Sequence, residues 1–388
     1  MANLSVNLCG VTLKNPVVAA SGTFGFGREY NELYDIGRLG GVSTKGLTLE
    51  PRLGNPTPRI AESRGVILNA VGLQNPGAEH FIAHDLEWLK GTGTAVIANV
   101  AGKTLEEYAA ICARLDGLAD MIELNISCPN VRCGGMAFGI RPESVREVTR
   151  VSKAALKKTP LMVKLSPNVE SVAANARAAE EGGADAVSLV NTFTGMAIDI
   201  ERRRPVLANN TGGVSGAGIK PIAVRMVFEA AHAVKIPVVG MGGITCAEDA
   251  VEFLLAGAVA VQVGTANFTD TSACPKIIDG LDAWCDAHGV KNIGELTGAR
   301  NAHRLTVLAV AAVAAVSLLP LITAALERRQ TVLYDNSFYI NQKIYANKLL
   351  DMDFPRLDDP KTHDDLSQIL QNEKWSGYGL GRVLDVET

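Results

Sequence analysis

The sequence has no excess of positive charge and no apolar leader. Its 37 lysine and arginine residues are outnumbered by 41 aspartate and glutamate residues, which gives a formal net charge of −4. This balance argues against a nucleic acid as a partner. The first ten residues, MANLSVNLCG, lack the basic region and the long apolar run of a signal peptide. We therefore expect a cytoplasmic protein.

Cysteine and histidine are present but scattered. The seven cysteines are an odd number spread through the chain, and neither they nor the six histidines show paired metal-ligand spacing. We therefore expect free thiols in a reducing compartment, no disulfide framework and no metal site. Hydrophobic residues make up 47% of the chain and charged residues 20%, so one large α/β domain can bury a sizeable core.

One long apolar run interrupts this picture. Residues 305–326, LTVLAVAAVAAVSLLPLITAAL, contain no charge and are long enough to span a bilayer. Basic residues flank the run on both sides, so the orientation of a span is not readable. The alternative is a buried alanine-rich helix, which the many alanines and Pro320 favour. The polar residues 327–388 that follow predict broken helices, and we treat 301–388 as an appended helical tail.

Residues 1–300 repeat a rhythm of a short apolar run, a turn and an amphipathic segment. Near-continuous apolar strands that alternate with helices indicate a parallel sheet, and eight such units fit a closed (β/α)8 TIM barrel better than an open sheet. The eight expected strands are PVVAASG (16–22), GVSTKG (41–46), AVIANVAG (95–102), MIELNIS (121–127), LMVKLSP (161–167), AVSLVNT (186–192), IPVVGMGG (236–243) and AVQVGTA (260–266).

Small or polar residues stand where these strands end. In a barrel those ends converge on one face, where the active site is built. Turns also favour glycine and asparagine, so each position alone has a simpler explanation. The residues are Ser21, Lys45, Asn99, Asn125, Lys164, Asn191, Gly242 and Gly264.

The last two strand ends predict a phosphate site. GMGG (240–243) and VGTA (263–266) follow strands seven and eight, where barrels often bind phosphate on backbone N–H groups. Glycine allows the backbone to approach the phosphate oxygens closely. The glycine-rich segment 211–221, TGGVSGAGIKP, supplies a third wall.

Lysines and amides dominate the remaining strand ends. A lysine inside a barrel is costly unless it faces an anion or an electron-rich ring, and Lys164 in VKLSP is the clearest case. Amides both donate and accept hydrogen bonds, which suits a planar heterocycle that carries N–H and C=O groups. Any single asparagine could instead satisfy loop backbone. The whole set is Lys45, Asn69, Asn99, Asn125, Asn130, Lys164, Asn191 and Thr192.

Two cysteines lie in ELNISCPNVRCGGMAFG, residues 123–139. A metal site would need two more ligands, and a disulfide is not expected in the cytoplasm. An inert buried cysteine is the common case. Cys128, however, follows a strand on the polar face, and modest tuning can make a thiol a general base. Cys133 has no comparable placement and is interpreted as structural.

Many motifs in order and spacing resemble the class 1B dihydroorotate dehydrogenases, over residues 1 to about 299. They are SGTFGFGREY, KGLTLEPRLGNPTPR, NAVGLQNPG, ANVAG, ELNISCPNVRCGGMAFG, VKLSPN, VNTF, TGGVSG, GMGGI and VGTANF. The resemblance implies an FMN-containing (β/α)8 barrel that oxidises dihydroorotate to orotate in de novo pyrimidine (UMP) biosynthesis. It also implies that Cys128 is the general base at C5 of the substrate and that hydride passes from C6 to the flavin.

The resemblance also implies the remaining site residues. Substrate-binding positions match Lys45, Asn69, Ala70, Val71, Gly72, Leu73, Asn125, Asn130, Asn191 and Thr192. Flavin-binding positions match Ser21, Lys45, Gly46, Asn99, Asn125, Lys164, Val190, Gly216, Gly242, Gly243, Gly264 and Thr265. Of these, the last four are expected at the phosphate.

In this family a second, iron–sulfur flavoprotein subunit carries FAD and a [2Fe–2S] cluster, passes electrons to NAD and completes a heterotetramer. Residues 1–388 show neither a four-cysteine cluster motif nor a GxGxxG fingerprint after a strand, so NAD use would need that partner. The tail resembles a membrane-proximal fragment of an ABC exporter. Two alternatives stay open: an enzyme like dihydropyrimidine dehydrogenase, and an inactive or membrane-anchored fusion with a transporter fragment.

Overall fold

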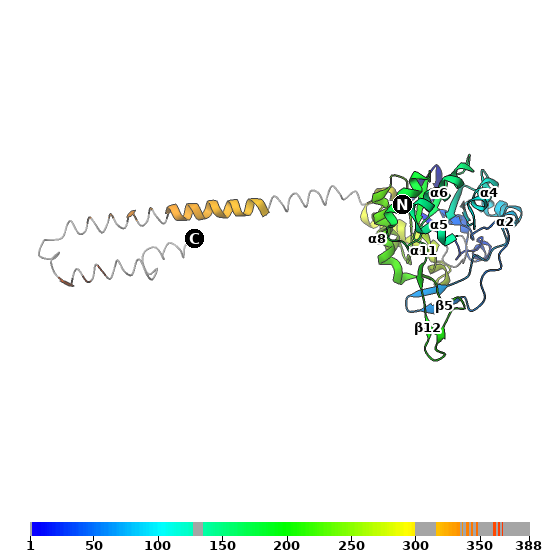
Figure 1. Cartoon of the computed structure of the whole chain (residues 1–388). Helices are drawn as coiled ribbons and strands as arrows, with labels where there is room; N and C mark the ends of the chain where they lie inside the picture. The colour runs from blue at the N-terminus through cyan, green and yellow to red at the C-terminus, as the bar shows by residue number, and fades with distance from the viewer. Residues whose placement is uncertain are drawn as a thin grey trace. The chain divides into compact units, whose positions relative to one another are not determined.

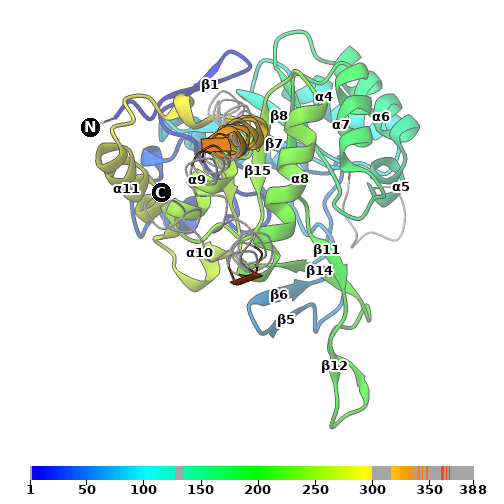
Figure 2. The same ribbon diagram turned by 90° about the vertical axis from the view of Figure 1, so that its left-hand side faces the viewer.

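The computed structural model describes residues 2–126, 135–298 and 316–333, together with isolated positions between 336 and 367. Contacts divide the chain into two units, residues 1–300 and residues 301–388, which are considered separately. Figures 1 and 2 show the first unit as a barrel of strands with helices around it.

Eight parallel strands close the barrel, in the order β10-β15-β16-β3-β4-β7-β8-β9. The closed parallel barrel predicted from the sequence is therefore confirmed. Its strands are almost wholly buried, because the barrel interior covers one face and the helices cover the other, and this explains their continuous apolar composition. The strands are β3 (Val17–Ala19), β4 (Gly41–Ser43), β7 (Ala95–Val100), β8 (Met121–Asn125), β9 (Leu161–Lys164), β10 (Ala186–Leu189), β15 (Val238–Met241) and β16 (Ala260–Val263).

The helices bury one apolar face against the barrel. In α4 the Thr104 hydroxyl accepts a hydrogen bond from the Glu107 backbone N–H, and in α7 Ser171 does the same for Ala174, so both helices begin at a capping side chain. The helices are α1 (Arg28–Asn31), α2 (Ala78–His84), α3 (Leu86–Gly91), α4 (Leu105–Leu115), α5 (Gly135–Ile140), α6 (Pro142–Ala154), α7 (Val172–Glu181), α8 (Lys220–Ala233), α9 (Ala247–Leu255), α10 (Ala266–Thr269) and α11 (Ala273–His288), with 3-10 turns η1 (Ile36–Arg38), η2 (Ala217–Ile219) and η3 (Ile293–Leu296).

A short hairpin closes the end of the barrel at which the strands begin. Strands β1 (Val6–Leu8) and β2 (Val11–Leu13) pair antiparallel, and Leu8 and Leu13 are buried in one cluster with Val18 of β3 and Met121 of β8. This apolar cluster fills the bottom of the barrel.

A four-stranded sheet lies at the opposite end. Its order is β11-β14-β6-β5, so segments far apart in the sequence pair with one another. Figure 2 shows this sheet together, with the β12 hairpin beyond it. The strands are β5 (Ile60–Ser63), β6 (Val66–Asn69), β11 (Phe193–Gly195), β14 (Gly212–Ser215), and the two-residue pair β12 (Ile198–Asp199) and β13 (Arg204–Pro205). The sequence pattern did not predict them.

In the second unit, residues 316–333 form a helix, drawn in orange in Figure 1. Within the ranges described, no helix is both long enough and apolar enough to cross a bilayer. The expected apolar segment 305–326 starts among residues outside those ranges, so a membrane span there stays a prediction.

One carboxylate fixes the turn before β9. Asp116, directly after α4, accepts hydrogen bonds from the backbone N–H groups of Lys157 (3.0 Å), Lys158 (2.9 Å) and Thr159 (2.9 Å). Partial burial would raise the pKa of the Asp116 carboxyl, but these donors outweigh burial and hold the pKa below its ordinary value.

We expect Asp116→Ala to lower the free energy of unfolding by ~1–2 kcal/mol at neutral pH, because three charge-assisted hydrogen bonds are lost. A depressed folded-state pKa stabilises the protein above the unfolded value of ~3.9 and loses that effect as the pH falls below it. The difference between wild type and variant should therefore shrink at acid pH in urea denaturation. Glu147→Ala, on the exposed face of α6, serves as the control, and equal effects of the two variants would contradict the assignment.

Candidate active site

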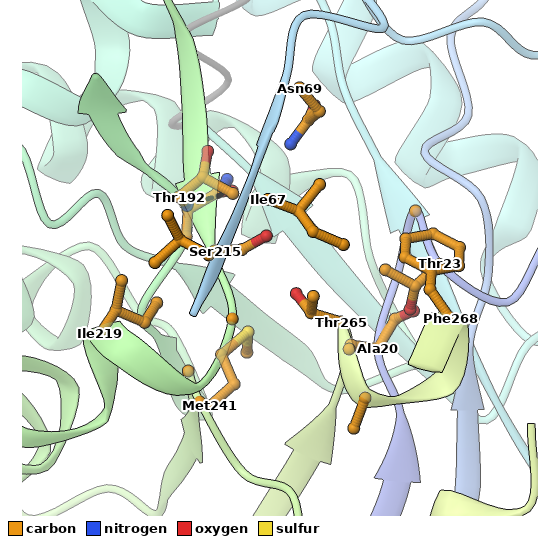
Figure 3. A pocket seen from close by; sticks show the side chains of 18 of the residues that line it. Ala20, Thr23, Ile67, Asn69, Thr192, Ser215, Ile219, Met241, Thr265 and Phe268 are labelled. Carbon is orange, nitrogen blue, oxygen red and sulfur yellow. Dashed lines mark hydrogen bonds between the residues drawn. The ribbon is translucent and has the colours of Figure 1, made fainter. Parts of the chain in front are cut away.

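A cavity of about 480 Å³ opens at the end of the barrel where the strands finish. This is the end at which TIM barrels carry their active sites, and the volume suits a small molecule or cofactor. Strands β5, β6 and β14 of the four-stranded sheet form one side of it. Figure 3 shows β6 passing across the pocket, with Ile67 near Ser215 of the neighbouring strand β14.

Two lysines and a set of amides line the cavity. Lys45 follows β4, Lys164 ends β9 and is 4% exposed, and Asn125 ends β8. The Asn191 amide donates to Asn125 Oδ1 over 3.2 Å, and Asn125 in turn donates to Asn99 Oδ1 over 3.3 Å. Cationic and amide groups thus converge on one space from several strands, as expected for recognition of a planar, polar, anionic ligand.

A buried carboxylate lies behind this wall. Glu123 of β8 is 0% exposed, and its oxygens accept hydrogen bonds from Ser43 Oγ (2.7 Å), Asn99 Nδ2 (2.6 Å), Ser188 Oγ (2.8 Å) and Gln262 Nε2 (2.6 Å). These donors come from β4, β7, β10 and β16. The carboxylate therefore joins five strands of the barrel around its axis.

The ammonium of Lys164 lies 3.8 Å from Glu123. Burial would raise the pKa of the Glu123 carboxyl, but Lys164 and the surrounding donors outweigh burial and hold this pKa below its ordinary value. Glu123 is therefore ionised, and the pair places a compensated charge under the pocket.

Glycines shape the other end of the cavity. Gly216, Gly242 and Gly243 line it with φ angles of 115°, 122° and 83°, a region that L residues rarely adopt. A Cβ at Gly243 would lie 2.7 Å from Cβ of Lys220 and 2.8 Å from its backbone nitrogen. Lys220 is itself held by Asp249 and Glu252, each at 2.7 Å. The backbone at this end is open to a ligand and rigidly supported.

Most residues expected at the site line this cavity. They are Ser21, Lys45, Gly46, Asn69, Val71, Gly72, Leu73, Asn125, Lys164, Val190, Asn191, Thr192, Gly216, Gly242, Gly243, Gly264 and Thr265. Ala70 is instead buried against Leu68 and Leu207, and Asn99 lies behind the cavity wall against Glu123. Cys128 and Asn130 fall outside the described residues, as does Cys133.

Sequence reasoning missed several lining residues. Glu62, Ile67 and Ser215 come from the unpredicted sheet, and Gln262 lies inside a strand that reads as apolar. Glu123 was missed as well, although the sequence places it in the middle of an apolar strand. A buried carboxylate costs free energy unless it has partners, so its position there could have indicated a polar network inside the barrel.

The fold and the site define a (β/α)8 barrel whose cavity is lined by amide and ammonium groups on one side and by glycine backbone on the other. A family model described as dihydroorotate dehydrogenase matches residues 3–284. The chain belongs to the dihydroorotate dehydrogenase family and is an oxidoreductase. The family predicted from the motifs is therefore confirmed.

Curated relatives match about three quarters of the chain and nearly their own full length. The protein of Alkaliphilus metalliredigens is 52% identical over 298 residues, which is 76% of this chain and 98% of that protein. That of Bacteroides fragilis is 54% identical over 302 residues, 77% of this chain and 99% of that protein. Both are named dihydroorotate dehydrogenase B (NAD(+)), catalytic subunit.

We expect Gly243→Ala to destabilise the protein by ~2–4 kcal/mol, because the methyl group adds overlap with Lys220 to the cost of a positive φ. Gly10→Ala is the matched control. Gly10 has a φ of 90° but nothing within 4 Å of its Cβ position, so it carries the backbone cost alone. Thermal melting of both variants measures the difference, and similar melting temperatures would show that contact with Lys220 does not constrain this loop.

Proposed function

We propose that this chain oxidises dihydroorotate to orotate as the FMN-carrying catalytic subunit of an NAD-linked dihydroorotate dehydrogenase, in de novo pyrimidine biosynthesis. The observation that carries the proposal is the composition of the cavity, where Lys45, Lys164 and the Asn125–Asn191 pair face a glycine-rich anion end. Family membership and the names of the relatives support the substrate.

The donor set suits FMN. The backbone at Gly242, Gly243 and Gly264 would hold the phosphate, and Lys164 would lie at the flavin ring. Gln262 provides a further test of fit: its buried Oε1 lacks a hydrogen-bond partner within the described part of the chain, although the residue lines the cavity. A ring N–H is the type of group that such an acceptor requires. When bound, FMN supplies a two-electron acceptor for the hydride from C6.

The substrate pocket would be formed by Lys45, the segment Asn69–Leu73, and the amides of Asn125, Asn130 and Asn191, with Thr192. Lys45 would bind the carboxylate of dihydroorotate, and the amides would pair with the ring N–H and C=O groups. Asn191 is held from two sides, since its Oδ1 accepts the Thr192 backbone N–H over 2.9 Å and its Nδ2 donates to Asn125. Such fixed amides orient the substrate without reorganising.

Cys128 is proposed as the general base. Its thiolate would take the proton from C5 while the electron pair of the C6–H bond leaves as hydride, so the new C5–C6 double bond of orotate forms. This role rests on the motif position of Cys128, since its structure is outside the described residues. As the proton leaves C5, the negative charge that develops on the neighbouring ring carbonyl oxygen would be compensated by the amides and lysines named above.

A separate subunit is proposed to take the electrons onward. The relatives are named catalytic subunits, which implies another subunit beside them. We propose an iron–sulfur flavoprotein with FAD and a [2Fe–2S] cluster that reduces NAD, in a heterotetramer. We further propose that residues 1–300 are the functional barrel and that 301–388 are an appended tail, with the barrel in the cytoplasm.

We expect the purified full-length chain to carry FMN and its flavin absorbance to bleach when dihydroorotate is added without oxygen. Dihydrouracil should leave the spectrum unchanged, because it lacks the carboxylate that Lys45 would bind. Bleaching by dihydrouracil alone would favour the enzyme like dihydropyrimidine dehydrogenase. Loss of bleaching with both substrates, in a flavin-loaded protein, would favour the inactive fusion.

We expect Cys128→Ala to keep its flavin and to lose turnover by roughly 10²–10⁴-fold, the usual effect of removing a general base. Cys133→Ala is the matched control, a thiol five residues away that should retain nearly full activity. Single-turnover flavin reduction measures both. Normal reduction in Cys128→Ala would refute its assignment as the base.

A further inference from the structure

Glu123 directs a chain of side-chain amides that ends in the pocket. Asn99 donates to Glu123, Asn125 donates to Asn99, and Asn191 donates to Asn125, at 2.6, 3.3 and 3.2 Å. At the far end, the Thr192 backbone N–H donates to Asn191. The hydrogen bonds therefore all run in one direction, from the loop after β10 down to the carboxylate.

Chemistry fixes this direction at both ends. An ionised carboxylate can only accept hydrogen bonds, and a backbone N–H can only donate. With Glu123 at one end and the Thr192 N–H at the other, each amide between them has one permitted orientation. The same reasoning applies to Gln262. Its Nε2 donates to Glu123, which fixes the amide orientation and directs its Oε1 away from the carboxylate.

Glu123 also sets the net charge beneath the cavity. Its carboxylate lies 3.8 Å from the Lys164 ammonium, and the two side chains are 0% and 6% exposed. Charges that are screened so little by water act strongly on their surroundings. Lys164, Asn125 and Gln262 line the cavity, and Glu123 contacts Lys164 and Gln262 directly and Asn125 through Asn99.

We propose that Glu123 is a positioning residue that sets the reduction potential of the flavin, by partly neutralising Lys164 and by orienting Gln262 and the amide chain. The inference rests on the proposed function, in which FMN occupies this cavity. Reduction adds two electrons and one proton to the flavin, so it leaves one more negative charge in the site. A fixed negative charge nearby makes that addition less favourable, and a positive one makes it more favourable.

The experiment compares two variants of the same carboxylate site in the flavin-loaded full-length protein. Glu123→Gln removes the negative charge and keeps the side-chain shape. Ser188→Ala removes one donor and keeps the charge, which is then less compensated. The two-electron midpoint potential of bound FMN is measured by spectroelectrochemical titration at fixed pH, with thermal melting and flavin content recorded for each protein.

We expect Glu123→Gln to favour reduced flavin by about tenfold, which is a shift of about +30 mV for a two-electron couple. Ser188→Ala should shift the potential in the opposite direction by a smaller amount. A merely structural role would loosen the same site in both variants and would not give shifts of opposite sign. The affinity for orotate, measured by titration of the flavin spectrum, should fall in Glu123→Gln because the amide direction is no longer imposed.

An unchanged potential in Glu123→Gln, or shifts of the same sign in both variants, would overturn the inference while leaving the proposed function standing. If Glu123→Gln retains no flavin, Ser188→Ala decides: a negative shift supports the inference, and an unchanged or positive potential overturns it. A wild-type chain without any flavin would overturn the proposed function and this inference together.

Discussion

A negative charge buried on the axis of a barrel has to be compensated from several directions at once, and much of this site follows from that requirement. Water cannot reach Glu123, so each carboxylate oxygen needs protein donors. Those donors come from four other strands, and a fifth contributes the Lys164 ammonium. The carboxylate therefore ties strand register to site chemistry, because a slip of one residue would turn a donor to the other face.

The strands themselves were predictable because their burial leaves a plain trace in the sequence. LMVK (161–164) and AVSL (186–189) are apolar apart from Lys164 and Ser188, since both faces of each strand are covered. Lys45, Lys164 and Asn125 were identified for a related reason: parallel strands finish on one face, so polar residues at their ends meet. Local pattern and topology together were sufficient for this part of the site.

The sheet over the pocket was not predictable in that way. β6 pairs with β14, about 145 positions further along the chain, and the Asn69 amide donates to the Gly213 carbonyl. No local period in IAES or VILN indicates such a partner, because the pairing depends on loops that a barrel brings together. Gln262 and Glu123 escaped notice for another reason. Each lies in the interior of a mainly apolar strand and not at its end, and its role depends on side chains from other strands.

The hairpin of β1 and β2 covers the end of the barrel that lies opposite the cavity. Leu8 and Leu13 seal the end where the strands begin, with Val18, Ile97 and Met121 packed against them at 0–1% exposure. The buried polar axis therefore has apolar packing below it and the cavity above it. A ligand in the cavity would cover Lys164 from above, so the Glu123–Lys164 ion pair would be enclosed on both sides while the ligand stays bound.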